Sequence, residues 1–170
     1  MPAIDASSQL ALRPISNQDR GFLYRLYACT REDEMALVNW SNSEKQNFLM
    51  MQFQAQSRFY ADEFPNASFD VIELDGQPVG RLYADVRDGE IRVIDIAILP
   101  EFRGRGIGSH YLQQVIQKAA EKNLNVGIHV ERNNPAMNLY QRLGFDKRED
   151  KGVYWFMVWC PGSGHENTAS

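Results

Sequence analysis

The chain has 170 residues and a formal net charge of −4 at pH 7; 44% of its residues are hydrophobic and 24% are charged. A chain of this length and composition is typical of one globular domain with enough apolar material for a core. The sequence lacks the basic stripe of a nucleic-acid-binding protein, and its longest apolar run, residues 153–160, is far too short to span a bilayer.

The cysteines and the start of the sequence bear on its compartment. Cys29 and Cys160 lie far apart and form neither a metal-ligand spacing nor a disulfide framework. The N-terminal residues lack the basic region and the apolar stretch of a signal peptide. We therefore expect a cytoplasmic protein with reduced cysteines, no bound metal, and neither a membrane nor a nucleic acid as its partner.

The first third of the chain reads as a short strand followed by helices. Residues 1–9 are small, polar and aperiodic, which predicts a flexible tail, and residues 10–15 read as the first strand. One helix is expected over about residues 19–30, and a second over residues 43–63 with Ser43 as its N-cap. The buried stripe of the second helix is predicted to be Phe48, Met51, Ala55 and Phe59.

The period of the pattern then changes from helix to strand. Residues 69–99 read as three strands joined by tight turns at Asp75-Gly76 and Asp88-Gly89, and Asp-Gly between apolar runs is a strong hairpin signal. A helix is expected from Gly106 to about Lys122. This order predicts a mixed α/β sheet that is antiparallel at first and has one parallel crossover through the helix at Gly106.

The end of the chain reads as a strand over residues 125–130, a short helix with Pro135 in its first turn, and a last strand over residues 153–159. Residues 161–170 are again small and polar, so we expect a second flexible tail there. The folded domain is therefore placed at residues 10–160.

Residues 103–108 read RGRGIG, with three glycines and two arginines between a strand and a helix. The unpaired N–H groups at a helix N-terminus form an anion site, and glycines let phosphates approach that backbone closely. The segment is neither a P-loop, because no Lys follows the last glycine, nor a dinucleotide fingerprint, because Ser109 stands where the third glycine would be. The pattern favours a phosphorylated cofactor; the alternative is a flexible turn with solvated arginines.

A second motif lies further along the chain. Residues 103–108 fit the pattern [QR]-x-x-G-x-[GA]; Asn133, Ala136 and Tyr140, followed by Gly144-Phe145, fit N-x-x-A-x-x-x-Y with a Gly-Phe pair behind it. The chain thus resembles the GNAT superfamily of N-acetyltransferases, whose acetyl-CoA-binding signature and second landmark these are. The tight resemblance covers about residues 91–145, and the N-terminal part of the chain matches only in layout.

The resemblance implies the GNAT fold, an α/β architecture with a mixed, mostly antiparallel sheet of six to seven strands, a splayed parallel pair and about four helices. In this family the pyrophosphate of acetyl-CoA sits on the loop that is here residues 104–109. The pantetheine arm runs between residues 93–99 and 125–130, and a backbone N–H beside it can polarise the thioester carbonyl. The residues expected to contact the cofactor are Ile96, Ala97, Ile98, Arg103, Gly104, Arg105, Gly106, Ile107, Gly108, Ser109 and Asn133.

The resemblance also implies roles for single side chains. Tyr140 matches the family tyrosine near the thioester sulfur, where a phenol can give a proton to the leaving thiolate; the alternative is a tyrosine packed in the core. Asn133 matches an asparagine that contacts the cofactor, or it merely caps the following helix. Pro135 at the first helical position makes Asn134 the better cap and leaves Asn133 free.

The general base is less well defined. Asp95 interrupts an apolar strand, where partial burial is expected to raise its pKa; a hydrogen-bonding role is the alternative. His129 lies on the neighbouring strand and titrates in the right range, although a lone strand histidine is often structural. Glu131 or a chain of waters is a further possibility.

The leading hypothesis is an enzyme, monomeric or homodimeric, that moves the acetyl group of acetyl-CoA directly to a primary amine. A small-molecule acceptor is favoured over a protein N-terminus or lysine, because no protein-docking module is recognisable. Acceptor recognition is expected in residues 28–64 and 148–154, including the acidic run at residues 31–34, which otherwise reads as a solvated face. The alternatives are an acyl-CoA-binding regulator with little turnover and a generic nucleotide-phosphate binder.

Overall fold

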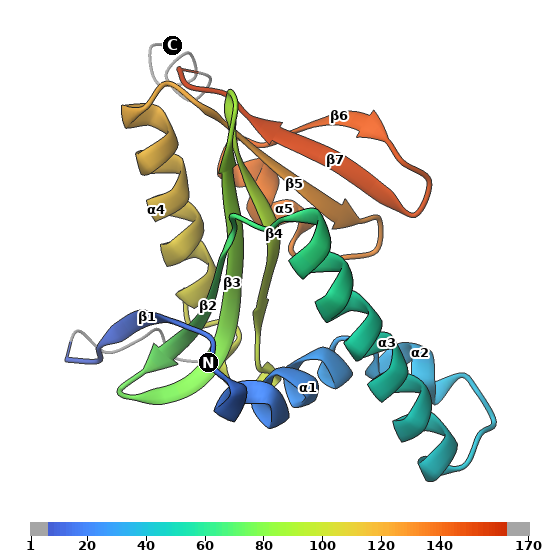
Figure 1. Ribbon diagram of the computed structural model, residues 1–170. Helices are drawn as coiled ribbons and strands as arrows, with labels where there is room; N and C mark the ends of the chain where they lie inside the picture. Colours follow the sequence, from blue (N-terminus) through green and yellow to red (C-terminus); the bar gives the residue numbers. More distant parts are fainter. Residues whose placement is uncertain (1–6, 163–170) are drawn as a thin grey trace.

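The computed structural model describes residues 7–162 and is shown in Figure 1. Most of the two predicted tails, at residues 1–9 and 161–170, therefore lies outside the described residues. Within them, seven strands form one mixed sheet in the order β1-β2-β3-β4-β5-β7-β6. The strands are β1 (Leu10–Pro14), β2 (Ser68–Leu74), β3 (Gln77–Arg87), β4 (Glu90–Ile98), β5 (Asn125–Glu131), β6 (Asp146–Asp150) and β7 (Tyr154–Trp159).

Five α-helices occur in the described part of the chain, one more than the sequence led us to expect, because a five-residue helix follows the first one. They are α1 (Arg20–Cys29), α2 (Glu32–Ala36), α3 (Asn42–Glu63), α4 (Ile107–Glu121) and α5 (Met137–Arg142), with short 3-10 turns η1 (Asn17–Asp19) and η2 (Pro100–Phe102). In Figure 1, α4 lies on one side of β3 and β4, and α3 lies on the other.

The pairing of the strands follows the predicted pattern. Strands β2, β3 and β4 are antiparallel neighbours, and tight turns join them. The turns have positive φ at Gly76 (83°) and Gly89 (79°), which glycine adopts without strain. Asp75 also has a positive φ of 52°, in the left-handed region that Asp tolerates in turns. Strand β5 then pairs with β4 in parallel and with β7 antiparallel, so β4–β5 is the one parallel pair of the sheet.

A β-bulge lies in β4 where the sheet opens. Ala84 of β3 is opposite Val93, and the next residue, Tyr83, is opposite Asp95, so Ile94 is an extra residue in the ladder. The parallel pairing of β4 with β5 ends at the same point, with Val93 and Ile128. Beyond it, β4 pairs only with β3 and β5 only with β7. We call this unpaired region, between residues 94–98 and 129–131, the wedge.

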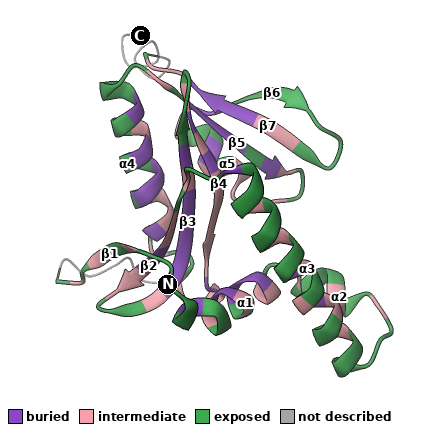
Figure 2. Ribbon diagram, in the orientation of Figure 1, coloured by how far each residue is buried: buried purple, intermediate pink, exposed green. Residues whose placement is uncertain are grey.

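The main core lies between α4, α5 and the centre of the sheet. The buried side of α4 consists of Ile107, Tyr111, Leu112, Val115 and Ala119. Figure 2 shows that buried residues fill β3 and β5 and one side of α4, while the outer side of α3 is mostly exposed. No helix among residues 7–162 is both long enough and apolar enough to cross a membrane.

The predicted buried stripe of α3 is wrong. Met51 is 61% exposed and Phe59 is 58% exposed, whereas Leu49 and Phe53 are buried against Leu23 and Tyr27 of α1. Apolar residues occur all around this helix, so its spacing alone does not single out the face that α1 covers.

The start of α3 also differs from the prediction. The helix is capped by Ser41 rather than Ser43, because the Ser41 hydroxyl accepts a hydrogen bond from the backbone N–H of Glu44 at 3.2 Å. The Glu44 carboxylate in turn accepts the backbone N–H of Ser41, which completes a capping box.

Candidate active site

The loop after β4 presents a helix N-terminus with open backbone amides. Gly104 and Gly106 have positive φ of 75° and 85°, and Gly106 is the N-cap of α4. The first helical hydrogen bond in this turn joins the His110 N–H to the Gly106 carbonyl at 2.9 Å, so the amides of the three residues between them point out of the helix end. Such an end favours a phosphate group.

Gly108 has no evident reason in the fold to be glycine. Its φ is not positive, and a Cβ built on it would have no other atom within 4 Å. A small side chain there would therefore fit without a clash. The absence of that side chain suits a ligand that approaches the backbone closely.

The two arginines of the loop each make a contact in or next to it, and Arg103 is exposed. The Arg103 Nε donates to the Ile98 carbonyl at 2.9 Å, which ties the loop to the end of β4. The Arg105 guanidinium carbon lies 5.1 Å from the centre of the Phe102 ring. Both cations thus stand at the rim of the anion site.

On the α3 side of the sheet, Asp95 is held in an ion pair. Its Oδ2 atom lies 2.5 Å from the guanidinium of Arg81, which is 4% exposed. Arg81 also donates to the Gln56 side chain of α3 at 3.1 Å and lies over the Tyr83 ring, 4.8 Å from its centre. Asp95 therefore faces α3, and the Arg81 guanidinium compensates its charge.

Two tyrosines surround this ion pair. The rings of Tyr60, on α3, and Tyr83, on β3, meet edge to face with 6.1 Å between their centres. Burial raises the pKa of both phenols, and the negative charge of Asp95 acts in the same direction. They remain hydroxyl groups at neutral pH, available as hydrogen-bond donors.

Four residues of this cluster were not predicted from the sequence: Arg81, Tyr60, Tyr83 and Gln56. One signal was available, since Arg81 interrupts the apolar pattern of β3 as Asp95 interrupts that of β4. Their pairing, however, depends on the register of the two strands, which the pattern does not contain.

Tyr140 reaches this region from α5, on the other side of the sheet. It is 5% exposed, and its ring packs against Phe145 with 5.9 Å between the centres. Burial raises its pKa well above the usual value, and the charge of Asp95 adds to the effect. The phenol therefore lies within the electrostatic reach of Asp95 and keeps its proton at neutral pH.

His129 lies on the same face of the sheet as Asp95. Val126, Ile128 and Val130 are buried in the core under α4 and α5, so the alternation of β5 turns His129 the other way. Its ring stacks on Phe156 with 4.9 Å between the centres. Partial burial, and then the positive charge of Arg92, lowers the pKa of the imidazole, so the ring is neutral at pH 7.

The two asparagines before α5 differ in their contacts. The Asn134 side chain accepts the Ala136 N–H at 2.8 Å, whereas Asn133 is exposed and makes no hydrogen bond with another described residue. Pro135, however, precedes the helix instead of opening it, because α5 begins only at Met137. The cap is thus a local turn just before the helix.

The connection between α1 and α2 spans the open end of the wedge. Burial, and then the charges of Glu32 and Glu101, raises the pKa of the Cys29 thiol at the end of α1. Arg31 then reaches Glu131, at the end of β5, with 3.4 Å between Nη1 and Oε1. Glu131, named above as a further possibility for the base, therefore lies in an ion pair with Arg31.

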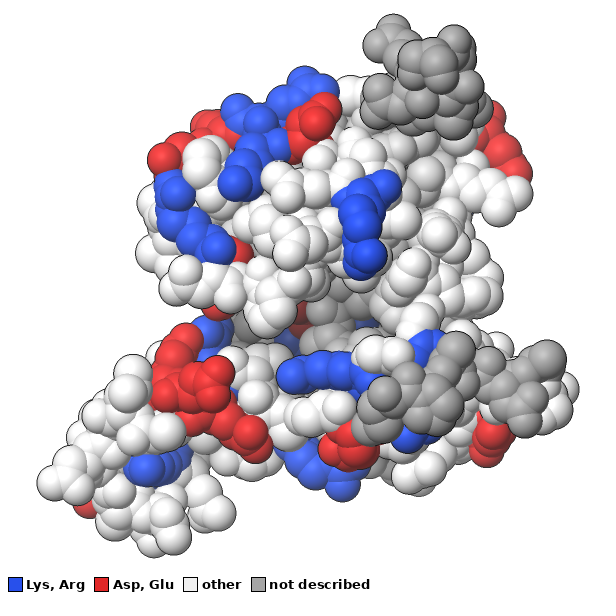
Figure 3. All heavy atoms as spheres, turned by 180° about the vertical axis from the view of Figure 1, so that it is seen from behind, with Lys and Arg blue, Asp and Glu red and all other residues white. Residues whose placement is uncertain are grey.

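Seen from behind, the surface is hollowed across its middle, with acidic and basic side chains on both sides of the hollow (Figure 3). Among residues 7–162, no three His, Cys, Asp or Glu side chains are grouped so that they could hold a metal ion. The described site thus consists of an open helix end, a wedge in the sheet, and buried phenols next to an ion pair.

These features agree with the comparison of the sequence with known families. The model of the Acetyltransferase (GNAT) family matches residues 26–145, and the chain belongs to this family. The family and the fold predicted from the sequence are thereby confirmed.

The chain is 34% identical over 91 residues to an uncharacterized N-acetyltransferase of Methanocaldococcus jannaschii; the match covers 48% of this chain and 40% of that protein. It is 32% identical over 94 residues to an N-alpha-acetyltransferase of Sulfurisphaera tokodaii, covering 46% of this chain and 56% of that protein. The chain therefore matches only about half of the length of each of these relatives.

Solved structures support the fold along nearly the whole chain. The PaiA N-acetyltransferase of Thermoplasma acidophilum, determined in complex with coenzyme A, aligns with a TM-score of 0.68 and 14% identity, covering 89% of this chain and 99% of that one. The ribosomal-protein-S18-alanine N-acetyltransferase of Escherichia coli aligns with a TM-score of 0.61 and 15% identity, covering 89% and 94% of the two chains. At these identities the likeness concerns the fold alone.

Proposed function

We propose that this protein is an acetyl-CoA-dependent N-acetyltransferase that acts directly on a primary amine. The observation that carries the proposal is the wedge: β4 and β5 separate beside a glycine-rich helix end, and the buried Tyr140 phenol lies close to Asp95 there. Membership of the GNAT family supports the same reading.

In this proposal the cofactor lies along backbone rather than along side chains. The amides of Ile107, Gly108 and Ser109 bind the pyrophosphate, and Arg103 and Arg105 add positive charge at the rim. The pantetheine arm enters the wedge and pairs with backbone groups of residues 96–98, which have no strand partner on the β5 side. The Ile98 carbonyl already accepts from Arg103, so the other groups of this segment remain for the arm.

The chemistry is a direct transfer. The neutral amine attacks the acetyl carbonyl, a C–N bond forms, the C–S bond breaks, and the coenzyme leaves as a thiol. Tyr140 gives its proton to the leaving sulfur, because its raised pKa keeps the phenol protonated until that step. The attacking nitrogen carries a surplus proton once the C–N bond has formed, and the return of this proton to the phenolate restores Tyr140. Asp95, held by Arg81, binds the ammonium group of the incoming acceptor, and His129, neutral at pH 7, accepts the proton that the ammonium must lose.

A small acceptor fits this site better than a protein segment. The Arg31–Glu131 contact closes part of the open end of the wedge, and Tyr60 and Tyr83 pack beside Asp95. We therefore infer a compact primary amine whose cation is received by one carboxylate and by aromatic rings.

A screen of acceptors tests the proposal. Purified protein, acetyl-CoA and a panel of small primary amines are mixed, and the release of the coenzyme thiol is followed. We expect turnover with members of the panel, and a strong loss of turnover in Tyr140→Phe. Binding of acetyl-CoA without turnover on any acceptor would instead favour an acyl-CoA-binding regulator. Preferential thermal stabilisation by ATP or NAD would contradict the family-based cofactor.

The second candidate acceptor is the α-amine of a protein N-terminus. It is favoured by the names of similar proteins, which include an N-alpha-acetyltransferase and a ribosomal-protein-S18-alanine N-acetyltransferase. A parallel panel of short peptides with different first residues decides between the two. Turnover confined to the peptides would replace the small-molecule assignment.

A further inference from the structure

A cavity of about 290 Å³ lies on the α4 side of the sheet, between α4 and strands β1 to β4. It is on the opposite face from the Asp95–Arg81 pair, which faces α3. Its apolar lining comes from Leu12, Leu82, Ala84, Val86, Ile91 and Val115. Its polar lining comes from Asn66, Ser68, Asp70, Tyr111, Gln114 and Lys118.

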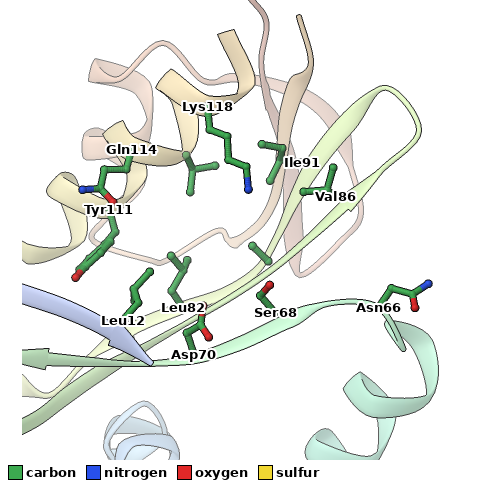
Figure 4. Close-up of a pocket in the computed structure, with 12 residues that line it drawn as sticks. Leu12, Asn66, Ser68, Asp70, Leu82, Val86, Ile91, Tyr111, Gln114 and Lys118 are labelled. Atoms are coloured by element: carbon green, nitrogen blue, oxygen red, sulfur yellow. The ribbon is translucent and has the colours of Figure 1, made fainter. Parts of the chain in front are cut away.

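Two opposite charges face each other across this cavity without touching. In Figure 4, the Lys118 side chain points into the cavity from α4, and the side chains of Asp70 and Ser68 point into it from β2. Neither Asp70 nor Lys118 makes a side-chain hydrogen bond or ion pair with any residue of the described chain. Burial alone raises the pKa of Asp70, so no neighbouring charge compensates this carboxylate.

Asp70 is only partly buried, but partial removal from water still makes an unpaired carboxylate less favourable than a paired one. Asp70 lies at an interior position of β2, with Pro14 and Leu82 as its neighbours on the two adjacent strands. Leu82 and the side chains of β3 next to it form an apolar floor between Asp70 and the Lys118 side. The cavity therefore presents a carboxylate and an ammonium group on facing walls, with an apolar floor beside them.

We propose that this groove is a second ligand site, separate from the acetyl-transfer site, for a small zwitterion of the amino-acid class. The ligand's ammonium group would bind Asp70, its carboxylate would bind Lys118, and an apolar side chain would lie on the floor. A volume of about 290 Å³ suits such a molecule and is too small for a coenzyme. Tyr111 and Gln114 belong to α4, so the ligand would contact the helix that begins at the proposed cofactor loop.

The site can be tested by NMR without acetyl-CoA, so the result does not depend on the proposed catalysis. Each proteinogenic amino acid is added at about 10 mM to ¹⁵N-labelled protein, because first ligands of small sites bind with Kd values of roughly millimolar order. For an apolar amino acid such as L-leucine, we expect saturable shifts at Ser68, Asp70 and Lys118. The absence of saturable shifts in the groove for every amino acid would overturn the proposal.

Matched fragments and variants separate charge recognition from simple apolar filling. The amine 3-methylbutylamine lacks the carboxylate of leucine, and 4-methylpentanoate lacks its ammonium; each should bind at least about tenfold more weakly than leucine. Asp70→Asn and Lys118→Gln should each weaken the binding of leucine by a similar factor. Glu121→Gln, an exposed change near the end of α4, should leave the binding of leucine unchanged. Equal binding of leucine to all three variants would contradict the proposal.

Both variants are expected to fold. Asp70→Asn removes an unpaired charge and should raise the melting temperature, and Lys118 is exposed. If leucine shifts only resonances around Asp95 and His129, the ligand binds the acceptor side and the second site is rejected.

Discussion

Arg81 is the residue on which the charge balance of the proposed acceptor side depends. Its guanidinium is almost fully buried and is shared by Asp95, Gln56 and the Tyr83 ring. A buried cation with these partners fixes both the charge and the direction of the Asp95 carboxylate. Arg81 therefore acts through Asp95 and does not itself need to touch the acceptor.

Replacing Arg81 should destabilise the fold and impair acceptor binding together. Arg81→Met leaves the Asp95 charge without its partner, so we expect the free energy of unfolding in urea to fall by about 3–5 kcal/mol. The matched control is Lys151→Met, which breaks an exposed pair with Glu149 and should cost less than about 1 kcal/mol. The double variant Arg81→Met with Asp95→Asn should recover part of the loss. If Arg81→Met and Lys151→Met lower the free energy of unfolding by the same amount, the buried Arg81–Asp95 pair has no special role in stability.

Tyr140 gives the sharpest kinetic prediction. Tyr140→Phe keeps the packing against Phe145 but removes the proton donor, so kcat should fall by about 100-fold while the Kd for acetyl-CoA changes little. Because the pKa of Tyr140 is raised, the phenol should stay protonated as the pH rises from 7 to about 10. The wild-type rate should therefore not fall over this range through ionisation of Tyr140. Stopped assays over this pH range provide the measurement. An unchanged kcat in Tyr140→Phe would remove the acid role.

At the scale of the elements, the first turn of α4 carries both folding and binding demands. Gly106 has a positive φ of 85°, which the fold itself requires, whereas Gly108 has ordinary helical backbone and open space around it. The two glycines can therefore be separated by experiment. Gly106 is required by the positive φ of the backbone at the start of α4, and a small residue at position 108 is required by the proposed ligand.

The two alanine variants should respond in opposite ways. Gly108→Ala should leave the free energy of unfolding unchanged or raise it by up to about 1 kcal/mol, because alanine favours the helix. Coenzyme A binding should be retained in Gly108→Ala, because alanine also fits the family pattern at this position, whereas the larger side chain of Gly108→Leu should weaken it by about tenfold. Gly106→Ala should destabilise the protein by about 1–2 kcal/mol. Calorimetric binding and urea unfolding measure both; undiminished binding by Gly108→Leu would contradict the assigned loop.

The junction of β1 with α1 predicts a response to acid. Asp19 accepts two hydrogen bonds from Arg13, at 2.7 and 2.8 Å, and the Ser16 N–H at 2.8 Å. The bonds from Arg13 are the main reason that the pKa of Asp19 is lowered to about 2. Because this pKa lies below that of the unfolded chain, ionised Asp19 stabilises the fold above about pH 4, and the contribution is lost as the pH falls towards 2.

We expect Asp19→Asn to lower the free energy of unfolding by roughly 2 kcal/mol at pH 7 and by much less near pH 2. The control is Asp62→Asn on the exposed side of α3, which should be neutral at both pH values. Urea unfolding at the two pH values measures the difference. A loss of the same size at both pH values would show that the carboxylate charge is not the cause.

At the scale of the whole molecule, one half of the sheet is a continuous ladder and the other half opens at the wedge. Binding of acetyl-CoA as proposed would add a partner only to the wedge side of β4. Hydrogen exchange should therefore slow by at least about tenfold for amides within residues 94–98 and for the first turn of α4. Strands β1 and β2 serve as an internal control and should exchange at unchanged rates. Uniform slowing across the sheet would indicate general stabilisation instead.

Motifs and turn residues carried most of what could be predicted from the sequence. The hairpins at Asp75-Gly76 and Asp88-Gly89 and the position of the glycine-rich loop follow from local backbone preferences, whereas the sheet of six to seven strands was expected from the family resemblance. These features depend on a few adjacent residues, which is why a sequence reveals them. The cofactor contacts and catalytic roles remain predictions.

Features that depend on distant pairings could not be predicted in the same way. The buried face of α3 is chosen by contact with Leu23 and Tyr27 of α1, and apolar residues around the whole helix conceal that choice. The Arg81–Asp95 pair depends on which residues of β3 and β4 face each other. A single extra residue shifts that register, and an alternating pattern does not show where it lies.

The bulge at Ile94 has one last consequence. Ile94 is an extra residue in an otherwise regular β3–β4 ladder, and the pairing of β4 with β5 ends at the residue before it. In a chain with Ile94 deleted, β4 could pair with β5 along the whole of both strands. The sheet would then be more complete, and the wedge proposed to hold the thioester would be closed. The proposed acyl transfer would therefore depend on one inserted backbone residue. Its deletion could abolish the activity although every side chain proposed for catalysis is still present.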